Sequence, residues 1–357
     1  MKDKILVVGG YGKVGRVICR DLGKKFPGKV IAGGRNYKKA KKFAKTTNGN
    51  VSPLELDVNV NPKKNNILEG VSIVIMCIDQ KNIQFIKCCL RKGVNYIDIT
   101  ASYNFLSEVE LLHNTAKSSG VTAILSVGLS PGLTNLLVQY SKNHFDVLEK
   151  VDISVILGLG EEHGKAAVEW MIDNINTTFQ ANKNGTEREI KSFTDGKKVD
   201  FFKTESNRTA YRFNFPEQHV LPKTLNVKEV SHRICFDSKF ITRILAFLKK
   251  LGILNFLELK KLRNAVVKFL NNIHLGSDKF IVKVKAFGKK EGKTTDFEFS
   301  ILGNNQTRIT GKVAAIVAEN IYTEKLSSGV YHIEEIFNLQ DIIAQLNNDI
   351  NFYFDDL

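Results

Sequence analysis

The chain has 357 residues, of which 43% are hydrophobic and 25% are charged; these proportions are typical of a folded globular protein and exclude an extended disordered one. Its 52 lysines and arginines against 37 acids give a formal net charge of +15, and no apolar run reaches the roughly 20 residues that span a bilayer. The length predicts two domains, and without a spanning run we expect no membrane partner. The five cysteines form neither a Cys-x-x-Cys pair nor an even disulfide framework, so we expect a reducing cytoplasm.

A short apolar run at residues 4–8 opens the chain and leads into Gly10, Gly12 and Gly15. The run is typical of a buried parallel strand, and the apolar residues after the turn recur at helical spacing. In such a unit the first two glycines allow a sharp turn beside a pyrophosphate, and the third allows close packing of helix on strand. The pattern predicts a dinucleotide site at the helix N-terminus. A glycine-rich turn without a ligand is the alternative.

The second strand, at residues 29–33, indicates which dinucleotide to expect. A site that prefers NAD usually places Asp or Glu about 20 residues after the motif, where the carboxylate accepts hydrogen bonds from the ribose. This chain has Arg35 there, followed by Lys38 and Lys39. A guanidinium binds a 2′-phosphate through paired, charge-assisted hydrogen bonds, so NADP is favoured and NAD is the less favoured cofactor. Alternatively, Arg35 is a solvated loop cation.

Apolar strands continue to alternate with helical segments through the first part of the chain. The expected elements are strands at 51–56, 71–78, 94–100 and 121–127, and helices at 82–91 and 106–118. This alternation predicts an α/β fold with a doubly wound parallel sheet of the Rossmann type. Ligands bind beyond the carboxyl ends of the strands in such sheets, so residues at strand ends are candidates for the site.

Three strand-end residues are candidates for contact with the cofactor. Asp57 closes the third strand, where it meets the adenine end or, alternatively, caps a turn. Cys77 and Ile78 end the fourth strand and would lie along the cofactor. For Cys77, plain core packing is the alternative.

A polar cluster follows the next strand and contains Asp98, Thr100, Ser102 and Tyr103. A carboxylate or a phenol beside the nicotinamide can act as a general acid and base, which makes Asp98 and Tyr103 the catalytic candidates. The alternative is that Asp98 and Thr100 cap the loop and bind its backbone amides. The seven histidines form no His-x-x-x-His pair and no Cys/His quartet, so no metal site is expected.

The pattern changes after residue 150. The expected elements are a strand at 151–157, a helix at 166–179, a polar turn-rich stretch at 182–195, helices at 241–259 and 260–273, a strand at 280–287 and a helix at 311–324. The alternation at 280–287 indicates a sheet with one face in water, so we expect a second α+β domain with a mixed or antiparallel sheet. Arg208, Arg212 and Arg233 are candidates to hold a substrate carboxylate, or else surface residues.

Several motifs, taken in order, resemble those of the saccharopine dehydrogenase-like family. They are the glycine turn at 9–15, Ala-Gly-Gly-Arg-Asn at 32–36, Tyr-Ile-Asp-Ile-Thr at 96–100, Gly-Leu-Ser-Pro-Gly-Leu-Thr-Asn-Leu-Leu at 128–137, Gly-Val at 329–330 and Glu-Glu at 334–335. The resemblance implies a Rossmann domain at 1–130 and a substrate and dimerisation domain at 131–310. It also implies a C-terminal helix, at about 311–357, that returns to the first domain, and a homodimer.

The resemblance also implies roles for individual residues. The implied cofactor contacts are Gly10, Tyr11, Gly12, Lys13, Val14, Gly15, Arg35 and Asn36. Cys77, Asp98 and residues 128–135 would form the nicotinamide side. Saccharopine reductases commonly carry acids where this chain has Ser126 and Ser130, and these carboxylates would meet the ammonium groups of saccharopine. Saccharopine itself is therefore less expected as the substrate, and relatives of lysine 6-dehydrogenase or carboxynorspermidine dehydrogenase remain as comparisons.

Together these features predict an NADP-dependent oxidoreductase that acts on a CH–NH bond of an amino acid or amine-derived substrate, with Asp98 or Tyr103 handling the proton. One alternative is an NADP-binding regulatory protein without catalysis, and another is a reductase of C=O or C=C bonds. The net charge raises a nucleic-acid-binding protein as a third alternative. The basic residues are spread over many short clusters, so a solvated surface is the favoured interpretation and no nucleic-acid partner is expected.

Overall fold

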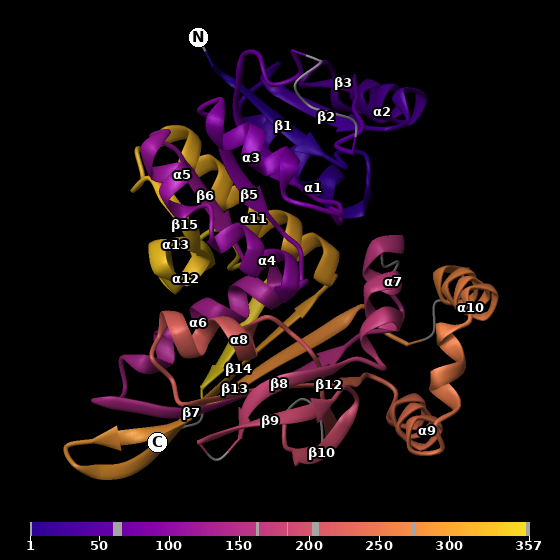
Figure 1. Cartoon of the computed structure of the whole chain (residues 1–357), viewed down its shortest axis with the longest axis vertical. Coiled ribbons are helices and arrows are strands. Elements are labelled where there is room, and N and C mark those ends of the chain that lie inside the picture. Colours follow the sequence, from indigo (N-terminus) through magenta and orange to yellow (C-terminus); the bar gives the residue numbers. More distant parts are fainter. Residues whose placement is uncertain are drawn as a thin grey trace. The chain divides into compact units, whose positions relative to one another are not determined.

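The structure is a computed structural model that describes residues 2–59, 66–161, 164–183, 185–201, 207–272 and 276–354 (Figure 1). The chain divides into two compact units. Unit 1 comprises Met1–Leu133 and Thr307–Gln345, and unit 2 comprises Thr134–Gln306 and Leu346–Leu357. The C-terminal helix expected at about 311–357 is shorter in the structure, because it ends at Thr323 and residues 346–354 belong to unit 2.

Unit 1 is built on a parallel sheet. Within the described residues its seven strands lie in the order β15-β6-β5-β4-β1-β2-β3, and every neighbouring pair is parallel. The strands are β1 (Lys4–Val8), β2 (Val30–Gly34), β3 (Val51–Glu55), β4 (Val71–Met76), β5 (Asn95–Asp98), β6 (Thr122–Leu125) and β15 (Gly329–His332). The inner strands are apolar on both faces because helices cover both. This sheet confirms the predicted Rossmann-type architecture.

Helices accompany the strands of unit 1. They are α1 (Lys13–Lys25), α2 (Tyr37–Ala44), α3 (Gln84–Arg91), α4 (Tyr103–Glu110), α5 (His113–Ser118), α11 (Gln306–Thr323), α12 (Ile333–Ile336) and α13 (Leu339–Ile343), with short turns η1 (Lys45–Thr47) and η2 (Leu129–Leu133). Ile18 and Leu22 of α1 are buried, as the helical spacing predicted. The single helix expected at 106–118 is two helices, α4 and α5, separated at residues 111–112.

Unit 2 contains a mixed sheet, in the order β10-β11-β12-β7-β13-β14-β16 within the described residues. β12 and β7 are parallel, and the other neighbours are antiparallel. The strands are β7 (Val147–Leu157), β10 (Thr194–Val199), β11 (Arg208–Arg212), β12 (Glu229–Phe236), β13 (Lys279–Lys290), β14 (Lys293–Asn304) and β16 (Ile350–Phe354). The mixed sheet confirms the fold class expected for this part of the chain.

The remaining elements of unit 2 differ in places from the prediction. They are α6 (Thr134–Lys142), α7 (Lys165–Asn174), α8 (Glu217–Thr224), α9 (Lys239–Lys250), η4 (Ile253–Glu258), α10 (Lys260–Asn272) and the hairpin of β8 (Thr178–Lys183) and β9 (Thr186–Lys191). The helix expected at 166–179 ends at Asn174, and the stretch expected to be turns forms strands. The reason is an apolar cluster of Phe179, Ala181 and Ile190, which is possible only when β8 and β9 pair.

Candidate functional site

The glycine turn joins β1 to α1, and its geometry leaves little or no room for a side chain at its glycine positions. A Cβ atom on Gly10 would lie 2.7 Å from the Cα of Ala32, and one on Gly12 would lie 3.0 Å from the carbonyl oxygen of Gly9. At Gly15 the Cβ would lie 2.3 Å from that same oxygen. Gly15 therefore lets the first turn of α1 pack directly against the loop, as the motif requires.

The N-terminus of α1 offers backbone amides without a competing side chain. Gly12 is the N-cap, no side chain caps the helix, and its first turn, which includes Lys13 and Val14, contains no acid. The macrodipole of the helix and these amides favour an anion at this position. The turn and the start of α1 therefore have the form of a site for the pyrophosphate of a dinucleotide.

Tyr11 connects this turn to the end of β2. Its ring packs against Gly34, where a Cβ would come within 2.6 Å of the ring, and its hydroxyl accepts a hydrogen bond from the backbone amide of Asn36 at 3.0 Å. The side chain of Asn36 accepts a hydrogen bond from the amide of Lys39 at 2.9 Å and so caps α2. Asn36 thus has a structural role, and its contact with a cofactor stays a prediction.

Arg35 lies exposed between Gly34 and Asn36, directly beyond β2. Asp57 lies beyond β3 and accepts hydrogen bonds from the backbone amide and the side chain of Asn59, at 2.9 and 3.0 Å. The bond from the amide is the main cause that lowers the pKa of Asp57, and the charge of Arg35 adds to it. Asp57 therefore caps a turn, which is one of the two roles that the sequence predicted for it. Arg35 lies near enough to act on Asp57 electrostatically.

Cys77 and Ile78 follow β4, the neighbour of β1. The amide of Cys77 donates to the carbonyl of Val8 at 2.9 Å, and a Cβ on Gly9 would lie 2.8 Å from the Ile78 side chain. The strand order reverses between β1 and β4, which is where doubly wound sheets bind their ligands. Burial, with a contribution from Asp98, raises the pKa of the Cys77 thiol, so the thiol stays neutral and is a poor nucleophile.

Asp98 ends β5 and is the centre of a hydrogen-bonded group at this edge of the sheet. Its side chain accepts a hydrogen bond from the Tyr96 hydroxyl at 2.6 Å and one from Nε2 of Gln80 at 3.2 Å. The second carboxylate oxygen accepts from the amide of Thr100 at 2.8 Å. The bond from the amide of Thr100 is the loop cap that the sequence analysis gave as the alternative role of Asp98. This cap is compatible with a role of the same carboxyl group as a general acid and base.

The environment of Asp98 changes its acidity. The residue is 1% exposed, and this burial, with a contribution from Asp79, raises the pKa of Asp98 to about 7. Hydrogen bonds from Tyr96 and Thr100 oppose the shift. Burial and the neighbouring Asp98 also raise the pKa of Tyr96, so its phenol stays a neutral donor. Asp98 can therefore take up and release a proton near neutral pH, which a general acid and base requires.

Two members of this group were not among the sequence candidates for catalysis. Tyr96 lies two residues before Asp98, so the two side chains lie on the same face of β5. Gln80 belongs to the segment after β4 and donates to the Tyr96 hydroxyl at 2.6 Å. The alternation along the strand is the signal that would have found Tyr96. Tyr103, the other catalytic candidate, is the first residue of α4 and is partly exposed.

Ser126, which occupies a position where saccharopine reductases commonly carry an acid, belongs to a second chain of polar contacts in unit 1. It follows β6 with a φ of 56°, and its buried hydroxyl lies 2.8 Å from Nδ1 of His332. Nε2 of the same ring lies 3.2 Å from the carboxylate of Glu110. His332 and Glu110 were not found from the sequence, because more than 200 positions separate the two ends of these contacts.

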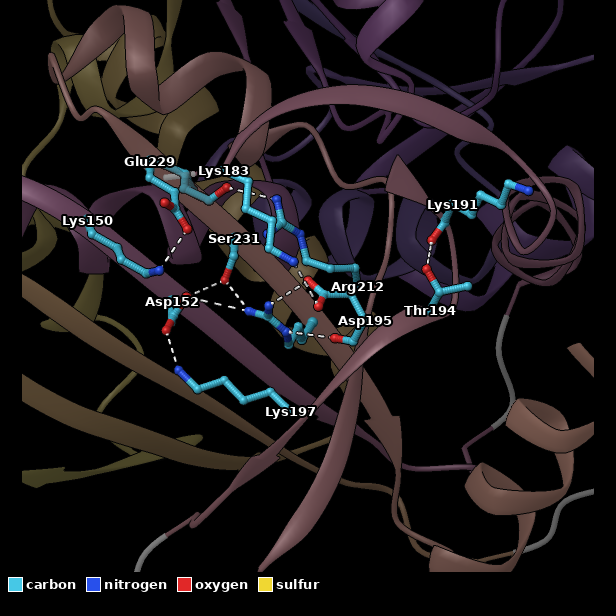
Figure 2. A network of polar contacts seen from close by, with 12 residues as sticks. Lys150, Asp152, Lys183, Lys191, Thr194, Asp195, Lys197, Arg212, Glu229 and Ser231 are labelled. Atoms are coloured by element: carbon cyan, nitrogen blue, oxygen red, sulfur yellow. Dashed lines mark hydrogen bonds and ion pairs between the residues drawn. The ribbon is translucent and has the colours of Figure 1, made fainter. Parts of the chain in front are cut away.

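Unit 2 contains a larger polar network on one face of its sheet (Figure 2). Asp152 of β7 binds Lys197 at 2.6 Å and accepts a hydrogen bond from Ser231 of β12. Arg233 donates to Ser231 and binds Asp195 at 3.1 Å. Burial opposes ionisation of Asp152, and the bonds from Lys197 and Ser231 outweigh it and lower its pKa. The network thus holds ionised groups in the interior of the unit.

The three arginines proposed as carboxylate binders are buried, so the alternative of surface residues is wrong for all of them. Arg208 donates to the carbonyl of Asp237 at 2.7 Å, and Arg233 is bound to acids. Arg212 is 0% exposed and lies opposite Arg233 in the register of β11 and β12. Among the described residues its Nε and Nη1 atoms have no hydrogen-bond partner, and desolvation with the charge of Arg233 lowers the pKa of Arg212 to about 10.

The different environments of these two arginines predict different effects of the same substitution. Arg233→Met leaves Asp152 and Asp195 without their buried cation and is expected to lower the free energy of unfolding by about 3–5 kcal/mol. Arg212→Met removes a poorly bonded charge that opposes Arg233, so we expect a loss below about 1 kcal/mol or a gain. Urea unfolding of both variants checks this. Equal losses would contradict the proposed difference between the two sites.

Comparison with known proteins adds to this geometry. Residues 5–124 match the family model of the saccharopine dehydrogenase NADP binding domain. The structure of apo, histidine-tagged saccharopine dehydrogenase (L-Glu forming) from Saccharomyces cerevisiae aligns over 99% of this chain and 100% of that one, with a TM-score of 0.66 and 12% identity. C. glutamicum DAP dehydrogenase in complex with DAP aligns over 97% and 99%, with a TM-score of 0.47 and 12% identity. The yeast structure shows the same fold.

The matched family is an NADP-binding one, which confirms the cofactor predicted from Arg35 and the glycine turn. The residues present fit this group, since the backbone at Gly10 and Gly15 leaves no room for a side chain, the N-terminus of α1 lacks an acid, and Arg35 follows β2. Within the described parts of the chain no cluster of His, Cys, Asp or Glu has the form of a metal site, and no helix there is long and apolar enough to cross a bilayer.

Proposed function

We propose that the chain is an NAD(P)-dependent oxidoreductase of the saccharopine dehydrogenase-like family and that it oxidises or reduces a C–N bond of an amino acid or amine-derived substrate. The match of residues 5–124 to the NADP binding domain of saccharopine dehydrogenase supports this proposal. NADP, when bound, supplies or accepts the hydride. The yeast protein of the same fold is a saccharopine dehydrogenase, which supports a substrate of this class. Ser126 and Ser130, where saccharopine reductases commonly carry acids, favour a substrate other than saccharopine itself.

The observation that carries the proposal is the position and acidity of Asp98. It ends β5, is paired in register with Met76 of β4, and acts electrostatically on Cys77 beside the glycine turn. A pKa of about 7 lets its carboxylate take the proton from a substrate nitrogen during oxidation and return it during reduction. Tyr96 and Gln80 orient the carboxyl group through their hydrogen bonds.

Further parts of the proposal concern the chain as a whole. Unit 2 is the substrate-binding and dimerisation domain, and the protein is a cytoplasmic homodimer. Tyr103 stays a second candidate for handling the proton, and contacts of Lys13, Val14 and Asn36 with the cofactor stay predictions.

The test is an NADPH-oxidation screen over carbonyl and amine pairs, run in parallel with NADH. We expect turnover with at least one such pair and a preference for NADPH. Arg35→Ala is expected to raise the KM for NADPH roughly 10- to 100-fold, because two charge-assisted bonds to the 2′-phosphate are lost, and to leave that for NADH nearly unchanged. Lys42→Ala, an exposed cation of α2, is the matched control.

Three outcomes count against the proposal. Tighter binding of NADH than of NADPH removes the role of Arg35. NADPH binding without turnover on any carbonyl and amine pair favours a regulatory protein. Turnover of carbonyl compounds without an amine favours a C=O or C=C reductase.

A further inference from the structure

The segment of unit 2 from residue 239 to 272 presents its apolar side chains to solvent. It comprises α9, η4 and α10, the orange helices labelled α9 and α10 in Figure 1. On α9 the exposed apolar residues are Phe240, Ile244, Phe247 and Leu251, whose spacing of four, three and four places them on one helix face. Phe240 is 72% and Phe247 is 60% exposed. An amphipathic helix normally buries this face, and here it lies outside.

The exposed apolar surface continues along the rest of the segment. Phe256 of η4 is 60% exposed, and Leu259 between η4 and α10 is exposed as well. On α10 the exposed apolar residues are Leu262, Phe269 and Leu270. Single exposed apolar residues are ordinary on protein surfaces, but a contiguous segment with this many indicates an interaction site.

The opposite side of the segment is attached to unit 2, so its orientation is determined. Lys249 donates to the carbonyl of Ile175 at 2.8 Å and to the side chain of Asn176 at 2.9 Å. On α10, Val267 packs with Val168 and Ile172 of α7. Arg263 binds both carboxylate oxygens of Asp173, at 2.5 and 2.6 Å. With this inner side fixed, the apolar stripe of α9 cannot turn inward.

The charge of the segment indicates what covers it. Residues 239–272 contain eight lysines and arginines and one acid, Glu258. The exposed cations Lys239, Arg243 and Lys250 accompany the stripe of α9, and Lys260, Lys261 and Lys268 accompany that of α10. Two copies of this face would bring like charges together, which opposes a contact between copies. An anionic partner neutralises these charges.

We propose that residues 239–272 bind the surface of an anionic phospholipid bilayer, with the phenylalanines and leucines in the acyl boundary and the cations at the headgroups. Apolar side chains beside basic ones, presented by helices along a surface, are typical of segments that lie in a membrane interface. The proposed binding is peripheral, because the inner side of the segment stays attached to unit 2 through Lys249, Val267 and Arg263. It differs from the sequence-based expectation of no membrane partner, and it is independent of the reaction proposed above.

Sedimentation with vesicles tests the proposal on the full chain. We expect binding to vesicles of phosphatidylglycerol and phosphatidylcholine and little binding to phosphatidylcholine alone. Binding is expected to decrease strongly in 0.5 M salt, where the Debye length falls to about 4 Å. Phe240→Ser with Phe247→Ser, and separately Lys260→Gln with Lys261→Gln, are each expected to weaken the binding by ~20-fold. NADPH binding and the melting temperature serve to show that each variant is folded.

Matched controls carry the same chemical changes elsewhere. Leu111→Ser changes an exposed apolar residue of unit 1, which is 82% exposed, and Lys289→Gln with Lys290→Gln changes two exposed lysines of β13. Both are expected to bind vesicles as the unchanged chain does. The proposal is overturned if both segment variants still bind the vesicles as the unchanged chain does, or if the unchanged chain binds to none of the vesicles. If, in addition, Phe240→Ser with Phe247→Ser converts a dimer to a monomer, the face is a contact between two copies instead.

Discussion

Replacing Asp98 with asparagine is expected to lower kcat by roughly 10²- to 10⁴-fold with little change in the affinity for NADPH. Asparagine is nearly the same size and retains an oxygen that accepts from Thr100, but it cannot take up a proton. The buried position and the pKa of about 7 make the carboxyl group suited to proton exchange with a substrate nitrogen. Steady-state kinetics and NADPH titration separate the two effects.

The pH dependence gives this prediction a sign. In the oxidative direction Asp98 must be ionised, so kcat of the unchanged enzyme is expected to rise through about pH 7. In the reductive direction the protonated acid is needed, and kcat is expected to fall as pH rises through the same value. The asparagine variant is expected to lose both inflections. A role in structure alone would not move the pH profile.

Asp57→Asn is the matched control, since Asp57 also follows a strand and caps a turn. It is expected to leave kcat nearly unchanged. Full turnover of the Asp98→Asn variant with intact NADPH binding would remove Asp98 from the mechanism and leave Tyr103 as the remaining candidate.

The same shift affects stability. The unfolded chain releases the Asp98 proton near its ordinary pKa of 3.8, and the folded protein holds it up to about 7. Since the folded state binds more protons in this window, this group lowers stability as pH rises from about 4 to 7. As pH rises from 5 to 8, the free energy of unfolding of the asparagine variant is therefore expected to increase by about 2–3 kcal/mol relative to that of the unchanged protein. Urea unfolding of both proteins at pH 5 and at pH 8 checks this.

Replacing Gly15 with alanine is expected to weaken NADPH binding roughly 100-fold. The added Cβ would lie 2.3 Å from the carbonyl oxygen of Gly9 and 2.7 Å from the Cα of Gly10, and both are backbone atoms that cannot rotate away. The turn must shift, which costs about 3 kcal/mol of folding free energy. It also moves the amides that face the phosphates, and losing two such bonds lowers the affinity roughly 100-fold.

Gly23→Ala in the same helix is the matched control. Its Cβ would lie 3.0 Å from a methyl group of Val51, a side-chain atom that can give way. Alanine also favours the helix by about 1 kcal/mol over glycine, which offsets the tight contact. We expect this variant to bind NADPH normally. A Gly15→Ala variant that binds NADPH as tightly as the Gly23→Ala variant would contradict the role of the turn in binding the phosphates.

Much of unit 1 follows from local pattern. Short apolar runs such as residues 4–8 and 71–76 are strands because they are buried on both faces, and Gly10, Gly12 and Gly15 allow one particular turn. Other elements depend on partners far along the chain. β15 lies beside β6, about 200 residues earlier, and its short sequence has no strong strand signal of its own. Similarly, β8 and β9 form because their apolar residues meet each other.

Local sequence pattern was enough to predict the class of fold, the dinucleotide turn, the NADP cofactor and the polar cluster at Asp98, because each depends on residues close together in the chain. Only the three-dimensional structure decided the acidity of Asp98, since that depends on burial and on Asp79, which belongs to the segment after the neighbouring strand β4. It also decided that the apolar stripe of α9 faces solvent. Periodicity defines the apolar face of a helix, but the packing of the opposite side determines where that face points.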